Sequence, residues 1–101
     1  MSELLVEIHV PLVPLAGEAH LSWIDDVEEL LSGVEDEGRG EVYDDGEEFG
    51  NEYLFFVWNA PESDLLGIAR EVAQLSGVPA GVYARVTDTG ADMGEGRRVD
   101  L

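Results

Sequence analysis

The sequence predicts an α+β fold with two helices and four strands in the order β-α-β-β-α-β. Two segments alternate between apolar and polar residues, which is typical of strands, and a third segment is apolar throughout. Two further segments carry apolar stripes at helical spacing and lie between these strands. Right-handed crossovers then place both helices on one face of an antiparallel sheet. The resulting strand order, 4-1-3-2, is the ferredoxin-like arrangement.

The first strand and the first helix are predicted before residue 35. Residues 4–10 alternate in the strand pattern, and Pro11 and Pro14 end the strand. A helix is predicted to begin at Ser22, because the acidic residues that follow suit a positive helix N-terminus, and to end at Gly33. The apolar stripe of this helix consists of Trp23, Val27, Leu30, Leu31 and Val34.

A hairpin is predicted next. Residues 40–43 form its first strand, and residues 44–51 read as a long acidic loop with glycines at its turns. Residues 53–58 form the strongest strand of the chain, because both of its alternating faces are apolar. A strand of this kind is usually central in a sheet and covered on both sides.

The second helix is predicted to open at Pro61 and Ser63 and to close at Gly77 and Pro79. Residues 80–87 then form a fourth strand, and residues 97–101 form either a short edge strand or a tail. The stripe of the second helix consists of Leu65, Ile68, Ala69, Val72 and Leu75.

Two segments carry a resemblance to a known class of protein. Within residues 40–66, an acidic loop with Asp45-Gly46 precedes an apolar strand that leads into a helix through Asp64-Leu65-Leu66. Residues 98–101, Arg-Val-Asp-Leu, close the chain. In these features the chain resembles small, poorly characterised bacterial ferredoxin-like acidic proteins. The resemblance implies the fold and brings no catalytic residue with it.

Composition predicts one domain over residues 1–101, because 45% of the residues are hydrophobic and 8% are aromatic. The chain has no cysteine, which excludes disulfides and thiolate chemistry. Its N-terminus lacks the pattern of a signal peptide, and no apolar run approaches the ~20 residues of a membrane span. We therefore expect a cytoplasmic protein.

The formal net charge of −18 is the strongest functional signal of the sequence. Thirteen carboxylates and one cation, Arg39, lie between Asp25 and Glu52. Such a field opposes folding by self-repulsion and attracts cations, so it disfavours nucleic acid or an anionic membrane as a direct partner. Two explanations remain: a basic protein partner, or an acidic surface adapted to a high-salt or high-GC source.

The first explanation predicts a non-enzymatic protein that neutralises or regulates a basic toxin, nuclease or effector, as an immunity protein or a DNA mimic does. The acids at 25–29 suit a helix start and a solvated helix face, so the partner site is expected at the hairpin. Its expected residues are Asp36, Glu37, Glu41, Asp44, Asp45, Glu47, Glu48 and Glu52. The second explanation predicts a homodimer that associates through the bare sheet face, with a housekeeping or ligand-sensing role.

His9 and His20 are the only histidines. The alternation of the first strand places His9 on the sheet face away from the helices, together with Glu7, Tyr83 and Arg85. A His–Glu pair near an arginine can perform acid–base chemistry, but no nucleophile motif or phosphate-binding loop accompanies it. We therefore expect polar residues on an open face and no catalytic residue.

Metal and cofactor sites are not expected either. The carboxylates at 44–48 cluster beside a turn glycine, as Ca²⁺ ligands do, but they lack the ligand spacing of an EF-hand. Arg97 and Arg98 are expected to pair with carboxylates of the chain itself.

Overall fold

The computed structural model of the protein describes residues 3–12, 22–75, 77–90 and 95–101, apart from the side chains of Ser22 and Asp45. His20 and Pro14 lie outside the described residues. The elements in chain order are β1 (Leu4–Pro11), α1 (Ser22–Asp36), β2 (Glu41–Phe49), β3 (Glu52–Trp58), α2 (Glu62–Ala73), β4 (Tyr83–Asp88) and β5 (Arg97–Asp100). In this part of the chain, neither helix is long and apolar enough to cross a membrane.

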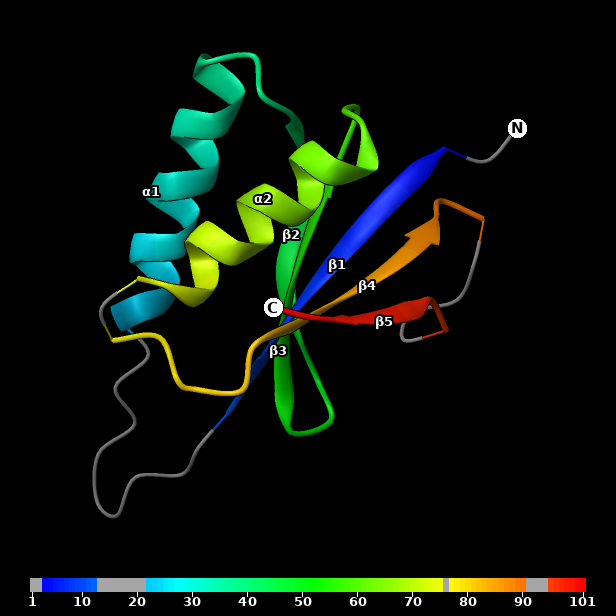
Figure 1. Cartoon of the computed structure of the whole chain (residues 1–101). Coiled ribbons are helices and arrows are strands. Elements are labelled where there is room, and N and C mark those ends of the chain that lie inside the picture. The colour runs from blue at the N-terminus through cyan, green and yellow to red at the C-terminus, as the bar shows by residue number, and fades with distance from the viewer. Residues whose placement is uncertain (1–2, 13–21, 76, 91–94) are drawn as a thin grey trace, which may run out of the picture.

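The fold is α+β, with α1 and α2 on one side of a twisted sheet (Figure 1). The strands lie in the order β2-β3-β1-β4-β5, and all four neighbouring pairs are antiparallel. The order of the four predicted strands is therefore confirmed. Residues 97–100 form an edge strand beside β4, so the sheet has five strands rather than four.

The predicted loop at 44–51 is wrong. These residues extend β2 to Phe49, and the turn is confined to Gly50 and Asn51. The acidic and glycine composition suggested a loop, but pairing with β3 keeps the segment extended through two register shifts. Gly46 lies in the second shift, where an added Cβ would approach Cε1 of Tyr53 to 2.7 Å.

The predicted end of α1 at Gly33 is also wrong, because the helix continues to Asp36. Val34 belongs to the buried stripe and holds this last turn against the core. The chain turns out of the helix at Gly38, which lies just beyond Asp36 and has a φ of +71°. The backbone N–H of Gly38 donates to Glu35 and that of Arg39 to Val34, a pairing that satisfies the last carbonyls of a helix.

The main core lies between the helices and the sheet. Both predicted helical stripes contribute to it, although α2 ends before Leu75, which packs against the core from beyond the helix. The sheet contributes the alternate side chains Val6, Ile8 and Val10 of β1, together with residues of β3 and β4. A second, smaller cluster lies on the other face of the sheet and consists of Leu5, Leu54 and Phe56, with Trp58 packed against it.

Candidate functional site

Exposed carboxylates follow one another along the chain, on a path from the end of α1 through β2. Asp36 is the last residue of α1, Glu37 follows it, and the next element along the chain, β2, is an edge strand of the sheet. The side chain of Asp45 lies outside the described residues. The exposed members of the path are Asp36, Glu37, Glu41, Asp44, Glu47 and Glu48. Six of the eight predicted partner-binding residues therefore lie exposed on this path, which we call the acidic edge.

The acidic edge spans both faces of the sheet. Glu41, Asp44 and Glu47 pair in register with Trp58, Phe56 and Leu54, which belong to the face away from the helices. Glu48 is opposite Tyr53, which packs against the main core. The hairpin thus brings the carboxylates along one edge but does not point them in a single direction.

Three arginines form ion pairs with carboxylates that do not belong to β2. Arg39 pairs with Glu71 and also with Glu37 at 3.6 Å. Arg97 pairs with Glu62 at 2.9 Å, and Arg98 pairs with Asp100 at 3.0 Å. The expected internal pairing of Arg97 and Arg98 is confirmed. These cations lie against carboxylates of α2 and β5 and, through Arg39, against Glu37 of the acidic edge.

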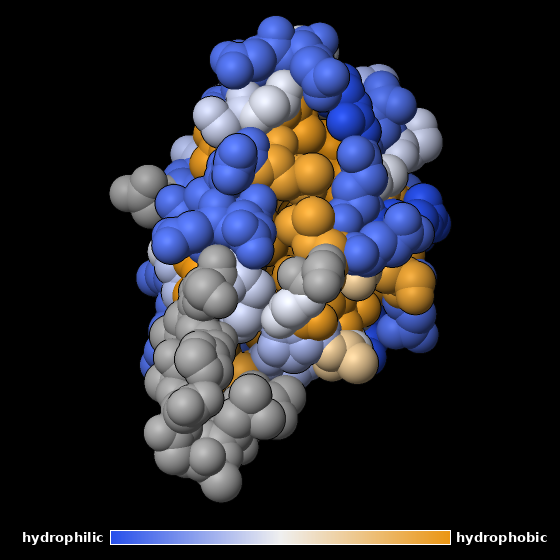
Figure 2. Space-filling view, turned by 90° about the vertical axis from the view of Figure 1, so that its left-hand side faces the viewer, coloured by the Kyte–Doolittle hydropathy of each residue, from blue (hydrophilic) through white to orange (hydrophobic). Residues whose placement is uncertain are grey.

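A groove of about 380 Å³ separates α1 from β2. Leu31, Val42 and Phe55 give it apolar walls, and the carboxylates of Glu28 and Glu35 line it from α1. On the side of the molecule seen in Figure 2, hydrophobic residues form a strip that hydrophilic residues flank. The sequence did not predict this groove, because its existence depends on how α1 sits above β2.

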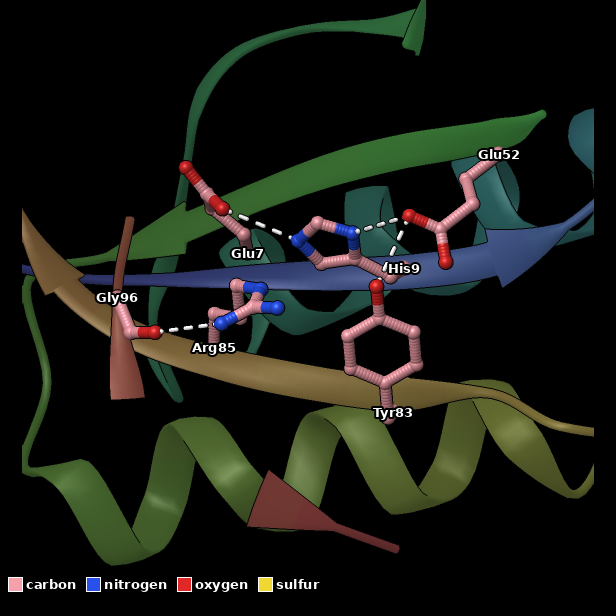
Figure 3. A network of polar contacts seen from close by, with 6 residues as sticks. All are labelled: Glu7, His9, Glu52, Tyr83, Arg85 and Gly96. Carbon is pink, nitrogen blue, oxygen red and sulfur yellow. Dashed lines mark hydrogen bonds and ion pairs between the residues drawn. The ribbon is translucent and has the colours of Figure 1, made fainter. Parts of the chain in front are cut away.

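The sheet face away from the helices carries a polar network around His9 (Figure 3). His9 Nε2 lies 3.0 Å from Oε1 of Glu7, and His9 Nδ1 lies 3.0 Å from Oε1 of Glu52. The hydroxyl of Tyr83 donates to the same Glu52 oxygen at 2.9 Å. The rings of His9 and Tyr83 are stacked, with centroids 4.7 Å apart. Arg85 donates to the carbonyl of Gly96 at 2.8 Å.

The predicted placement of Glu7, His9, Tyr83 and Arg85 on one face is confirmed, but the expectation of an open polar surface is wrong. His9 is 1% exposed and Glu7 is 2% exposed. Tyr83 covers His9, and the guanidinium of Arg98 from β5 lies 4.0 Å from the centre of the Tyr83 ring. A side chain of the fifth strand thus covers part of a face that a four-stranded sheet leaves bare.

The two contacts of His9 constrain its protonation. An ionised carboxylate only accepts hydrogen bonds, so each contact requires a hydrogen on the ring nitrogen or on the carboxyl group. The arrangement is therefore satisfied by an imidazolium between two carboxylates, or by a neutral imidazole with one protonated carboxyl group. Among the described residues, no buried side-chain nitrogen or oxygen lacks a hydrogen-bond partner.

Glu52 is the predicted partner-binding residue that differs most from the others. Its side chain is 25% exposed and is held by His9 and Tyr83. Burial alone raises the pKa of Glu52, but the hydrogen bonds from His9 and Tyr83 outweigh burial and lower this pKa from its usual value. Burial and the bond to Glu52 raise the pKa of Tyr83.

A smaller pocket of about 150 Å³ lies beside the network, where Glu7, Tyr43 and Glu47 are among its lining residues. Among the residues that the structure describes, no group of three or more His, Asp or Glu side chains is arranged to hold a metal ion. Comparisons of the chain with protein-family models, with curated proteins and with solved structures find no match.

Proposed function

We propose that this protein is a non-enzymatic binding protein that holds a basic protein partner by electrostatic complementarity. A toxin immunity protein or a DNA-mimicking nuclease inhibitor acts in this way. One observation carries the proposal: exposed carboxylates follow one another along the chain from the end of α1 through the edge strand β2. Folding brings them together at a cost in self-repulsion, which a basic partner offsets.

The placement of the cations supports this proposal. Arg97 and Arg98 pair with carboxylates outside the acidic edge, whereas Arg39 pairs with both Glu71 of α2 and Glu37 of the edge. These three cations therefore lie against carboxylates outside β2. Complementary fields of this kind raise association rates by roughly 10–10³ and make binding depend strongly on salt. β2 also carries two register shifts, which make an edge strand a poor template for a further strand. Side chains rather than backbone pairing are therefore expected to bind the partner.

The His9 network supports a non-enzymatic role. A general base must lie within hydrogen-bond reach of a substrate proton. His9 is buried, and both of its ring nitrogens face carboxylates of the chain itself. Its contacts are those of a structural network that joins β1 to β3.

The alternative, an acidic surface adapted to salt and a dimer through the sheet face, receives less support. Leu5, Leu54 and Phe56 on that face are already buried within one chain. A second copy would gain little by covering these three, although Tyr43, which lines the pocket beside them, is 41% exposed. We further propose that the chain is a ferredoxin-like domain with an added fifth strand, related to the small bacterial proteins that it resembles, and that it acts in the cytoplasm.

Charge reversal at the acidic edge tests the proposed function. The variant Asp36→Lys, Glu37→Lys, Glu47→Lys and Glu48→Lys changes four exposed residues of the edge. The matched control reverses four exposed carboxylates elsewhere, with the same change in formal charge: Glu3→Lys, Asp26→Lys, Glu29→Lys and Glu95→Lys. Circular dichroism verifies that both variants are folded.

The parent and both variants are used at low salt to capture proteins from a lysate of the source cells, and mass spectrometry identifies what each retains. We expect the parent and the control variant to retain the same basic protein, and the edge variant to lose it. Retention by all three proteins would overturn the proposal. Equal loss in both variants would show that net charge alone is responsible, as an adaptation to salt predicts.

A further inference from the structure

The groove between α1 and β2 differs from the rest of the acidic edge because apolar side chains form part of its lining. Leu31, Val42 and Phe55 form its walls, and Leu31 and Phe55 belong to the main core. Its volume, about 380 Å³, falls within the range of roughly 300–1,000 Å³ that is usual for ligand pockets. It is large enough to receive a bulky side chain.

Carboxylates stand on both sides of this groove. Glu28 and Glu35 line it from α1, and Asp44 of β2, which lies between the two register shifts, lines both this groove and the smaller pocket beside the His9 network. Glu28 and Asp44 are exposed, and one oxygen of Glu35 accepts the backbone N–H of Val42 at 3.2 Å, which fixes that carboxylate at the rim. A partly apolar lining between carboxylates is complementary to an apolar side chain flanked by cations.

We propose that this groove receives a segment of the basic partner in which one large apolar or aromatic side chain is flanked by lysines or arginines. The apolar side chain enters between Leu31 and Val42, and its basic neighbours pair with the rim. The proposal rests on the proposed function and deepens it. Buried apolar anchors surrounded by polar contacts dominate the affinity of most protein interfaces, whereas exposed charges mainly steer association.

Ser32 offers a way to block the groove without changing its charge. It is exposed on α1 and lines the groove, so Ser32→Trp fills the space that the partner side chain would occupy. Ser63 is an exposed serine of α2 that does not line the groove, so Ser63→Trp adds the same side chain elsewhere on a helix. Circular dichroism and urea unfolding verify that both variants keep the fold.

The probe is a synthetic peptide with one tryptophan between flanking lysines, and calorimetry at low salt measures its binding. Two altered peptides are measured with it: one has glycine in place of the tryptophan, and one has glutamates in place of the lysines. We expect the parent protein to bind the tryptophan peptide about tenfold more tightly than the glycine peptide. Ser32→Trp should remove this advantage, and Ser63→Trp should keep it. The glutamate peptide should not bind measurably.

Equal binding of the tryptophan and glycine peptides to the parent protein would overturn the proposal, as would an advantage that survives Ser32→Trp. Tight binding of the glutamate peptide would also overturn it, because the groove would then be a general apolar site. These results are separable from a failure of the proposed function. If Ser32→Trp has no effect while charge reversal of the acidic edge abolishes capture of the partner, the partner binds the edge but does not enter the groove.

Discussion

The imidazole of His9 on β1 contacts the carboxylate of Glu52 on the neighbouring strand β3, with Nδ1 and Oε1 3.0 Å apart. Glu52 begins β3, and His9 lies near the end of β1, so the contact fastens the hairpin turn to the centre of the sheet. It also removes one carboxylate from the acidic edge. The sequence groups Glu52 with its acidic neighbours, whereas the structure assigns it a local role in stability.

The ionisation of Glu52 is expected to contribute to stability near neutral pH. Its pKa is lowered in the folded protein, so the unfolded chain binds a proton at this site more readily than the folded chain does. The contribution is therefore present above the ordinary pKa of 4.5 and is lost as the pH falls through the lower, folded value.

Urea unfolding of the parent and of Glu52→Gln between about pH 6 and pH 3 measures this contribution. The other carboxylates are common to both proteins, so their mutual repulsion largely cancels in the difference between the two free energies of unfolding. We expect this difference to be constant above pH 4.5 and to shrink below it. A difference that is independent of pH would contradict the assignment.

The contact between His9 and Glu7 is expected to appear as a coupling free energy. His9→Ala removes the hydrogen-bond partner of the buried carboxyl group of Glu7, and leaving a buried polar group without its partner costs about 1–3 kcal/mol, or more if the group is charged. Glu7→Gln removes the charge that makes the loss expensive. The cost of His9→Ala should therefore be smaller in the Glu7→Gln background, by about 0.5–3 kcal/mol. Free energies of unfolding from urea titrations of the four proteins give the coupling, and strict additivity would show that the two residues do not interact.

The period-2 alternation of β1 was sufficient to place Glu7 and His9 together, and that of β4 placed Tyr83 and Arg85 with them. Their burial could not be predicted in the same way. It depends on the ring of Tyr83 lying over His9 and on Arg98 reaching this ring from β5, and both depend on strand twist and register. The engagement of Glu52 likewise follows from the β1–β3 register, which pairs His9 with Leu54 and Pro11 with Glu52.

The length of β2 shows the limit of composition as a guide. Aspartate, glutamate and glycine at 44–48 are typical of turns, and their local preference predicted a loop. The tertiary context overrides it, because Tyr53 and Leu54 of β3 supply pairing partners for Glu48 and Glu47. The helices were easier to predict than β2, since their apolar stripes and their burial against the sheet agree.

Two glycines are expected to respond in opposite directions to alanine. Gly33 lies inside α1 with no atom within 4 Å of an added Cβ, so Gly33→Ala should stabilise the protein by about 0.5–1 kcal/mol. At Gly46, an added Cβ would lie 2.7 Å from Cε1 of Tyr53 and 3.2 Å from the carbonyl oxygen of Leu54. Gly46→Ala should therefore cost about 1–3 kcal/mol. Thermal unfolding of both variants checks the pair, and a gain in stability for Gly46→Ala would contradict the bulged structure of β2.

Salt is expected to stabilise this protein, because the formal charge of −18 makes repulsion between carboxylates a term that opposes folding. At about 1 M sodium chloride the Debye length falls to ~3 Å, which screens exposed charges from one another. The free energy of unfolding should therefore rise from low salt to 1 M.

The rise should be smaller for the variant with lysines at 36, 37, 47 and 48, since reversal there reduces both the net charge and its concentration on the edge. Urea unfolding across this salt range measures both slopes. Equal slopes for this variant and for the control with lysines at 3, 26, 29 and 95 would show that net charge alone sets the response, whereas a smaller slope for the edge variant would identify the acidic edge as the main source of the repulsion.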